Sequence, residues 1–201
     1  YFANEYLLGR TPNPCIACNR HLKFDAMLKK AELLGADKVA TGHYANIDYD
    51  AASGRYLLRR AAAATKDQTY ALYALTQAQL AHTLMPLGQF KSKDEVREYA
   101  KKLGLPTAKK KDSMEICFVP DQDYAAFIQR RVGALPPEGD FVDLEGNVLG
   151  RHKGVVHYTV GQRKGLGIAF GKPMFVVRID AAKNQVVLGE SGSEFSDSLL
   201  A

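Results

Sequence analysis

The pattern that most limits how this chain can fold is a helix, a glycine stop and a short apolar strand in its first quarter. Apolar residues recur at helical spacing over residues 19–34, and Gly35 follows as a stop. The apolar segment 37–41 reads as a buried strand that leads directly into Gly42 and His43. In α/β sheets, ligands gather at the carboxyl ends of the strands. The pattern therefore predicts an α/β domain with Gly42 and His43 at a binding site.

Further elements are predicted from turn and capping residues. Two alternating segments flank the turn-rich stretch 50–54, which indicates a β-hairpin. Ser92 opens a capping-box sequence, and Asp121 is expected to cap one more helix that runs to about Arg131. The hairpin is expected to pair 45–49 with 56–60, and the helix after Ser92 is expected to span 93–103. Two more helices are predicted over 69–75 and 77–84.

The character of the sequence changes after Gly133. Residues 135–139 read as a linker, and helical periodicity disappears beyond them. Short alternating segments follow at 141–144, 147–149, 174–180 and 185–189, so we predict a small β-rich domain. The predicted organisation is an α/β domain over 1–132, a β-rich domain over 133–190 and a polar tail over 191–201.

The net charge of the chain permits an anionic partner. The sequence has 27 Lys and Arg against 22 Asp and Glu, a net charge of +5. Two basic clusters, Lys109–Lys111 and Arg163–Lys164, lie beside a cysteine and a glycine-rich motif. We expect them to contact a polyanion, because phosphate neutralisation supplies the sequence-independent part of nucleic-acid affinity.

Membrane and secreted classes are disfavoured. No apolar run approaches the roughly 20 residues that a membrane span needs, and the N-terminus has neither region of a signal peptide. Three cysteines do not make a disulfide scaffold in a chain of this size. We therefore expect a cytoplasmic protein with no membrane partner. The chain begins at Tyr1 rather than at a methionine, and we interpret it as part of a longer enzyme.

The three cysteines are the strongest indication of chemistry. Cys15 and Cys18 form a C-x-x-C pair and Cys117 lies far downstream, all flanked by polar, basic or turn-forming residues. A structural zinc wants four ligands, and neither His21 nor His43 has ligand spacing to Cys117. A thioredoxin-like pair wants a strand before it and a helix opening at its first cysteine, whereas two prolines precede this pair. Both interpretations are weak.

Two other interpretations suit three thiols. Three cysteine ligands can hold an iron–sulfur cluster with one open iron. Alternatively, one thiolate carries a terminal sulfur as a persulfide, and a second thiolate attacks it by thiol–disulfide exchange. Lys109–Lys111 would favour the thiolate of Cys117 by their charge, and a helix starting just after Cys18 would favour that of Cys18 through its dipole. From the residues alone both stay open.

Five sequence blocks, which together cover nearly the whole chain, match the motifs of one enzyme family in the family's order. They are G-R-T-P-N-P at 9–14 with Cys18-Asn19 and Lys23-Phe24, A-T-G-H-Y at 40–44, K-D-Q-T-Y at 66–70, A-K-K-K-D-S at 108–113 with Ile116-Cys117-Phe118, and Y-T-V-G-Q-R-K-G-L-G at 158–167. One block alone would be weak support, but five in order are specific. On these motifs the chain resembles the tRNA-specific 2-thiouridylase family.

The resemblance implies an adenine-nucleotide-hydrolase-like (PP-loop type) parallel-sheet domain and an enzyme that acts on tRNA. Such enzymes use ATP, with Mg²⁺ expected, to adenylate C2 of the wobble uridine, and then replace the oxygen with sulfur from a persulfide. A donor protein of a sulfur relay supplies that sulfur. The position matching Cys117 carries the persulfide. Cys18 matches the nucleophile that releases the sulfur, with a Cys18–Cys117 disulfide as the by-product.

The same motifs imply the remaining site residues. One segment meets the target base, a glycine contacts ATP, and two further groups contact tRNA. The matching positions are Asn13, Pro14 and Cys15 for the base, Gly42 for ATP, and His43, Lys66, Asp67 and Gln68 for tRNA.

The chain departs from the family pattern in two ways. Better-described members carry an aspartate, a proposed general base, where this chain has Cys15, so that role does not carry over. This keeps a [4Fe–4S] cluster bound by Cys15, Cys18 and Cys117 as an alternative, with no other metal site expected. The N-terminal Ser-Gly-Gly-x-Asp-Ser phosphate loop and the C-terminal β-barrel of the family are also absent from the sequence.

We therefore interpret the sequence as a fragment, truncated at its N-terminal side, that alone does not catalyse thiolation. A rival interpretation from another class is a non-catalytic RNA-binding module.

Overall fold

The computed structural model describes residues 1–109 and 116–198. Contacts group the chain into two compact units. Residues 13–112 form one, here called the central unit, and residues 1–12 with 113–201 form the other, here called the terminal unit.

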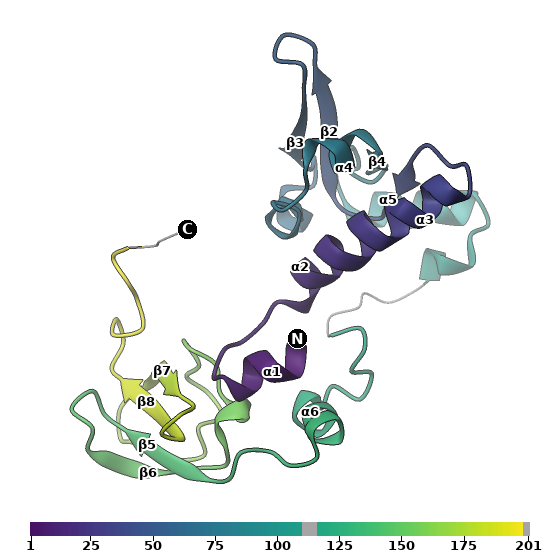
Figure 1. Ribbon diagram of the computed structural model, residues 1–201. Coiled ribbons are helices and arrows are strands. Elements are labelled where there is room, and N and C mark those ends of the chain that lie inside the picture. The colour runs from purple at the N-terminus through teal and green to yellow at the C-terminus, as the bar shows by residue number, and fades with distance from the viewer. Residues whose placement is uncertain (110–115, 199–201) are drawn as a thin grey trace. The chain divides into compact units, whose positions relative to one another are not determined.

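The central unit begins with a continuous helical rod. Figure 1 shows its three segments following one another without a break. The rod ends where predicted, because Gly35 adopts a φ of +75°, a conformation that glycine reaches without steric cost. Its segments are α2 (Pro14–Cys18), the π-helix η1 (Asn19–Ala26) and α3 (Met27–Leu33).

The strand predicted after the rod is present and pairs in parallel. β1 (Val39–Ala40) lies beside β4 (Thr83–Leu84), and the Thr41 N–H donates to the Leu84 carbonyl at 2.9 Å. A parallel pair with helices before each strand confirms the predicted α/β character. Gly42 follows directly at the carboxyl end of β1.

The predicted hairpin is confirmed as β2 (Ala45–Asp50) with β3 (Arg55–Arg60) in antiparallel register. Two helix predictions differ from the structure. The helix expected over 77–84 is α4 (Gln77–Ala81), since its last residues enter strand β4. The stretch 69–75 forms only the 3-10 turn η3 (Thr69–Ala71).

Helix α5 (Lys93–Lys102) matches its prediction closely. The Ser92 hydroxyl accepts the Glu95 N–H at 3.2 Å, and Gly104 follows with a φ of +66°. A buried cluster of Phe24, Ala45, Leu72 and Met85 forms one core of the unit. The short 3-10 elements of the unit are η2 (Ala64–Lys66) and η4 (Pro106–Lys109).

In the terminal unit, α1 (Phe2–Leu7) packs with α6 (Tyr124–Val132). The prediction that Asp121 caps this last helix was wrong. Asp123 is the cap, and its carboxylate accepts the Ala126 N–H at 2.8 Å. Asp121 instead accepts the Asp123 N–H and pairs with Arg130.

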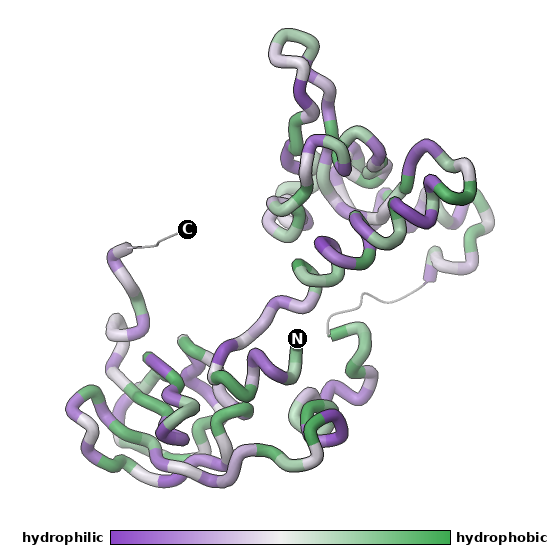
Figure 2. The backbone as a smooth tube through the Cα atoms, viewed as in Figure 1, coloured by the Kyte–Doolittle hydropathy of each residue, from purple (hydrophilic) through white to green (hydrophobic). Residues whose placement is uncertain are grey.

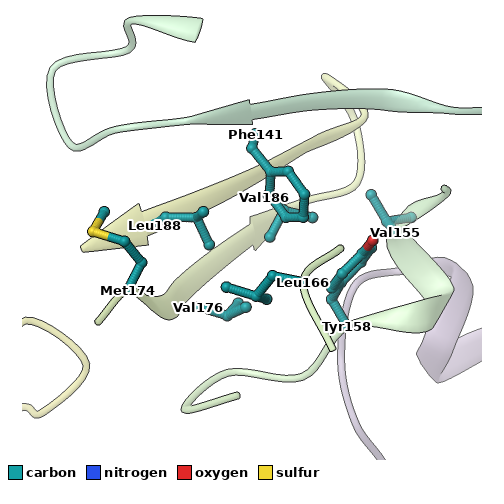
Figure 3. Packing of buried hydrophobic residues seen from close by; sticks show 8 residues of the cluster. All are labelled: Phe141, Val155, Tyr158, Leu166, Met174, Val176, Val186 and Leu188. Carbon is teal, nitrogen blue, oxygen red and sulfur yellow. The ribbon is translucent and has the colours of Figure 1, made fainter. Parts of the chain in front are cut away.

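The predicted β-rich segment forms a four-stranded sheet in the order β6-β5-β8-β7, in which β5 and β8 are parallel. Side chains from β5, β7, β8 and the intervening loops converge on one buried core (Figure 3). The elements are β5 (Gly139–Val142), β6 (Val148–His152), the 3-10 turn η5 (Val155–His157), β7 (Phe175–Asp180) and β8 (Gln185–Gly189).

The compact units do not divide at residue 133, where the sequence predicts a boundary. Helix α6 belongs with the β-rich part because Ile128 and Val156 share a buried cluster with Phe2 and Tyr6 of α1. The helices of both units alternate between hydrophilic and hydrophobic residues in Figure 2. Within residues 1–109 and 116–198, no helix is both long and apolar enough to cross a membrane.

Candidate active site

The C-x-x-C pair lies in the first turns of the helical rod. The Asn13 side chain caps the helix by accepting the Cys15 N–H at 3.0 Å, and Pro14 occupies the first helical position. The prediction that a helix starts just after Cys18 was therefore wrong. The helix starts earlier because Asn13-Pro14 is itself a start signal, so Cys15 lies in the first turn and Cys18 ends α2.

All three thiols are free and none belongs to a core. Cys15 and Cys117 are exposed and Cys18 is half-buried. Cys117 lies in a turn of the terminal unit. The next residue, Phe118, anchors this turn, because its ring contacts the rings of Phe2 and Phe127. Lys110 and Lys111, expected to favour the Cys117 thiolate, lie outside the described residues. Their effect stays a prediction.

The π-helix η1 places two side chains of the rod in the interior of the central unit. Asn19 and Phe24 are both 1% exposed, although the residues between them are exposed or half-buried. Residues five apart stack on one side of a π-helix but not of an α-helix. The Asn19 amide donates to the Ala71 carbonyl at 2.9 Å, and the Phe24 carbonyl accepts the Gln79 side chain at 2.6 Å. The π-helical register thus lets two inward contacts anchor the helix that carries Cys18.

Asn19 was missed as a functional candidate, because only the π-helical register turns it inward. Its side-chain oxygen is buried and has no hydrogen-bond partner among the described residues. Replacing Asn19 by alanine leaves the buried Ala71 carbonyl unpaired, and we expect a loss of about 1–3 kcal/mol of unfolding free energy. Denaturant unfolding of Asn19→Ala measures it. The exposed neighbour provides the control, since Arg20→Ala is expected to change stability by under about 0.5 kcal/mol.

His43 is held inside the central unit. It is 8% exposed, its Nδ1 lies 2.9 Å from the Thr41 hydroxyl, and its ring lies 5.8 Å from that of Phe24. Burial, with a smaller effect from the charge of Lys23, lowers the pKa of His43 to about 4. The imidazole is therefore neutral at pH 7. If it contacts tRNA as predicted, it does so as a neutral hydrogen-bonding group and not as a cation beside a phosphate.

This pKa predicts a pH-dependent stability. Because the folded pKa lies below the ordinary value of 6.5, the unfolded chain binds the proton more readily between these values. The free energy of unfolding is expected to fall by on the order of 3 kcal/mol as pH drops from 6.5 to 4. His43→Asn should remove the part of this pH dependence that comes from His43. Unfolding curves across that range measure it. His152 and His157 also have pKa values lowered by burial, so the deciding quantity is the difference between wild type and variant at each pH.

In the segment Lys66–Gln68, two of the three side chains accept hydrogen bonds from the backbone. The Asp67 carboxylate accepts the backbone N–H groups of Ala61, at 2.8 Å, and Thr69. Burial opposes ionisation of Asp67, but hydrogen bonds from Thr69 and Ala61 outweigh it and lower its pKa. The Gln68 side chain accepts the Tyr44 N–H at 3.0 Å. Lys66 is the one exposed residue of the three, so its side chain is the one in this segment that is accessible to a partner.

These contacts join the predicted site residues of the central unit. Asn19 links the cysteine helix to Ala71 in the segment 66–71. Gln68 of that segment binds the Tyr44 N–H in the loop after β1, and the Phe24 ring of the cysteine helix packs on His43 in the same loop. Gly42 is exposed at this end of β1, and a Cβ added there would lie 3.7 Å from Leu87, an ordinary contact. These contacts thus hold the loop after β1, the segment 66–71 and the cysteine helix together. Cys117 belongs to the other unit.

The described residues contain no group of three or more His, Cys, Asp or Glu side chains gathered to hold a metal ion. Cys15 and Cys18 supply two accessible thiols on one helix, which fits two of the three ligands that the cluster alternative requires.

Two family models match the chain. Residues 1–121 match the tRNA methyl transferase HUP domain, and residues 125–190 match the tRNA methyl transferase PRC-barrel domain. These matches support the predicted order of a PP-loop-type α/β domain followed by a small β domain. They assign α1 to the first domain, whereas in the structure α1 packs with α6 in the terminal unit.

Curated relatives match over the whole chain. The chain is 56% identical over 201 residues to the tRNA-specific 2-thiouridylase MnmA of Clostridioides difficile, 59% to that of Acetivibrio thermocellus and 57% to that of Clostridium acetobutylicum. It covers 55%, 56% and 56% of these proteins respectively. The chain thus spans about half the length of the curated relatives it matches.

Proposed function

The chain belongs to the family of tRNA-specific 2-thiouridylases, and on this premise we propose that it takes part in ATP-dependent replacement of oxygen by sulfur at C2 of the tRNA wobble uridine. The observation that carries the proposal is the half-buried thiol of Cys18. It lies on a helix that Asn19 and Phe24 anchor to the segments bearing Gly42 and Lys66.

The proposed reaction has two stages. The uridine O2 first attacks the α-phosphorus of ATP, and pyrophosphate leaves. The terminal sulfur of a persulfide on Cys117, loaded by a donor protein, then attacks C2 and AMP leaves. The Cys18 thiolate next attacks the inner sulfur of Cys117, so the bond to the transferred sulfur breaks and 2-thiouridine is released. A Cys18–Cys117 disulfide remains, and every atom is accounted for.

In this proposal the central unit supplies the groups that position the base, ATP and the tRNA. Asn13, Pro14 and Cys15, at the start of the helix, meet the base in this proposal, and Gly42 contacts ATP. Neutral His43 and exposed Lys66 contact the tRNA, whereas Asp67 and Gln68 act by holding the loop in shape.

The deciding experiment uses the full-length protein with ATP, a persulfide-loaded donor and a tRNA that has a wobble uridine. We expect 2-thiouridine in the digested tRNA, and none when Cys117 is replaced by serine. Ala17→Ser, a small-residue change beside Cys18 that removes no thiol, serves as the control and should retain activity. Nucleoside mass spectrometry also separates sulfur exchange from addition of a methyl group. Thiolation that persists in Cys117→Ser would make the thiols bystanders and leave an RNA-binding module as the better interpretation.

The second candidate mechanism uses a [4Fe–4S] cluster held by Cys15, Cys18 and Cys117, with inorganic sulfide as the sulfur source. The observation that favours it is a thiol at position 15, exposed in the first turn of the helix. Such a cluster would supply an open iron site for sulfide. Anaerobic purification followed by iron and acid-labile sulfide analysis separates the two, since the persulfide mechanism requires no iron.

The role of Gly42 in ATP binding has a test of its own. Gly42→Ala should fold normally, because the added methyl group meets only Leu87 at an ordinary distance. If the Gly42 backbone approaches ATP closely, the methyl group should weaken ATP binding by about tenfold or more. Calorimetric titration of full-length wild type and variant with ATP measures this. Equal affinity would remove Gly42 from the nucleotide site.

A further inference from the structure

We propose that Cys15 and Cys18 form a reversible dithiol–disulfide pair, in which Cys15 takes over the disulfide that sulfur transfer leaves on Cys18. The inference rests on the proposed function for the source of that disulfide. It assigns a chemical role to Cys15, which occupies the position where better-described members of the family carry an aspartate.

The helix brings the two thiols to one side. Cys15 and Cys18 are three residues apart within α2, a regular α-helical segment. This spacing separates their Cα atoms by about 5 Å, inside the range of about 4.4–6.8 Å that disulfides span. Both thiols are free, one exposed and one half-buried, so neither is shielded by a core.

The turn that carries them is free to tighten. Side chains three apart on a helix have Cβ atoms about 5–6 Å apart, whereas a disulfide needs about 4 Å. No residue of α2 is buried, so closing this gap disturbs no core contact. The inward anchors, Asn19 and Phe24, begin only after Cys18 and hold the remainder of the rod in place.

One objection to a redox pair also falls away. The two prolines before the motif suggested a loop, but Pro14 is the first residue of the helix and Asn13 caps it. The C-x-x-C pair therefore opens a helix, as it does in redox-active dithiols.

The exchange balances without an added oxidant. The Cys15 thiolate attacks the Cys18 sulfur of the Cys18–Cys117 disulfide, a Cys15–Cys18 bond forms, and Cys117 leaves as a thiolate. Cys117 is then ready to receive the next sulfur atom. Two low-molecular-weight thiols reduce the Cys15–Cys18 bond, becoming oxidised to one disulfide, and return both cysteines to thiols.

The test maps disulfides in the full-length protein. After turnover with ATP, persulfide donor and tRNA, the reaction is quenched in acid, free thiols are alkylated and peptides are sequenced by mass spectrometry. We expect a Cys15–Cys18 disulfide with Cys117 alkylated in wild type, and the same in the Ala17→Ser control. In Cys15→Ser the disulfide should remain between Cys18 and Cys117. Wild-type protein that keeps Cys18 bonded to Cys117, with Cys15 fully alkylated, overturns the proposal.

A second measurement needs no turnover. Full-length Cys117→Ser is equilibrated with mixtures of reduced and oxidised glutathione, where oxidised glutathione accepts the two electrons. We expect Cys15 and Cys18 to lose alkylation together in one two-electron transition. Independent loss, or mixed disulfides with glutathione at every ratio, contradicts the pair. Absence of 2-thiouridine from wild type would instead count against the proposed function, so the two failures are distinguishable.

Discussion

Gly88→Ala is expected to destabilise the central unit by about 3 kcal/mol or more. A Cβ at this position would lie 2.0 Å from the Ala45 carbonyl oxygen and 2.3 Å from the Asn46 side-chain oxygen, and no such contact can persist. The Gly88 carbonyl also accepts N–H groups from Ala62, at 2.8 Å, and from the Asn46 side chain. The backbone must therefore move at the start of β2, where Ala45 is fully buried.

Chemical denaturation of the two glycine variants measures this effect. Gly42→Ala is the matched control, because it adds the same methyl group where the nearest atom is 3.7 Å away, and neither glycine has a positive φ. A Gly88→Ala protein as stable as Gly42→Ala would show that the contact of residue 88 with β2 is not as tight as described.

Cys18→Ser in the full-length protein should reduce 2-thiouridine formation by more than about a thousandfold. A serine hydroxyl does not attack a persulfide or mixed-disulfide sulfur, so the sulfur that C2 has received stays bound to Cys117. The change should not disturb the fold, since Cys18 is half-buried and no residue of α2 belongs to a core. The measurements are the 2-thiouridine content of tRNA and the mass of the Cys117 peptide.

The peptide mass makes this prediction specific. Under the persulfide mechanism, Cys18→Ser should retain sulfur on Cys117, whereas the cluster mechanism predicts no persulfide and a loss of bound iron. Ala17→Ser again provides a neighbouring change that leaves the thiol in place. Thiolation at the wild-type rate in Cys18→Ser would exclude Cys18 as the nucleophile.

Local signals predicted most of the elements well. The glycine stop at Gly35, the hairpin of β2 with β3 and the capped helix α5 depend on neighbouring residues, and the structure has them at or close to the predicted positions. One error occurred where two local signals compete. Asp121 and Asp123 are both cap-type residues before α6; in the structure Asp123 accepts the Ala126 N–H, and Asp121 accepts the Asp123 N–H.

The sequence proposed a set of site residues but not their arrangement. Motif order made Cys18, Gly42 and Lys66 candidates, and the cysteines suggested sulfur transfer. It did not show that His43 is neutral or that the Gln68 side chain binds the Tyr44 N–H, because each of these depends on residues distant in sequence.

The sequence by itself determined the fold class, an α/β unit followed by a β-rich segment, and the family to which the chain belongs, and it placed three thiols in specific motifs. Only the tertiary structure decided how the helix of Cys18 is oriented. Its π-helical stretch turns Asn19 and Phe24 inward, because the Ala71 carbonyl and the His43 ring offer them partners that no local pattern reveals.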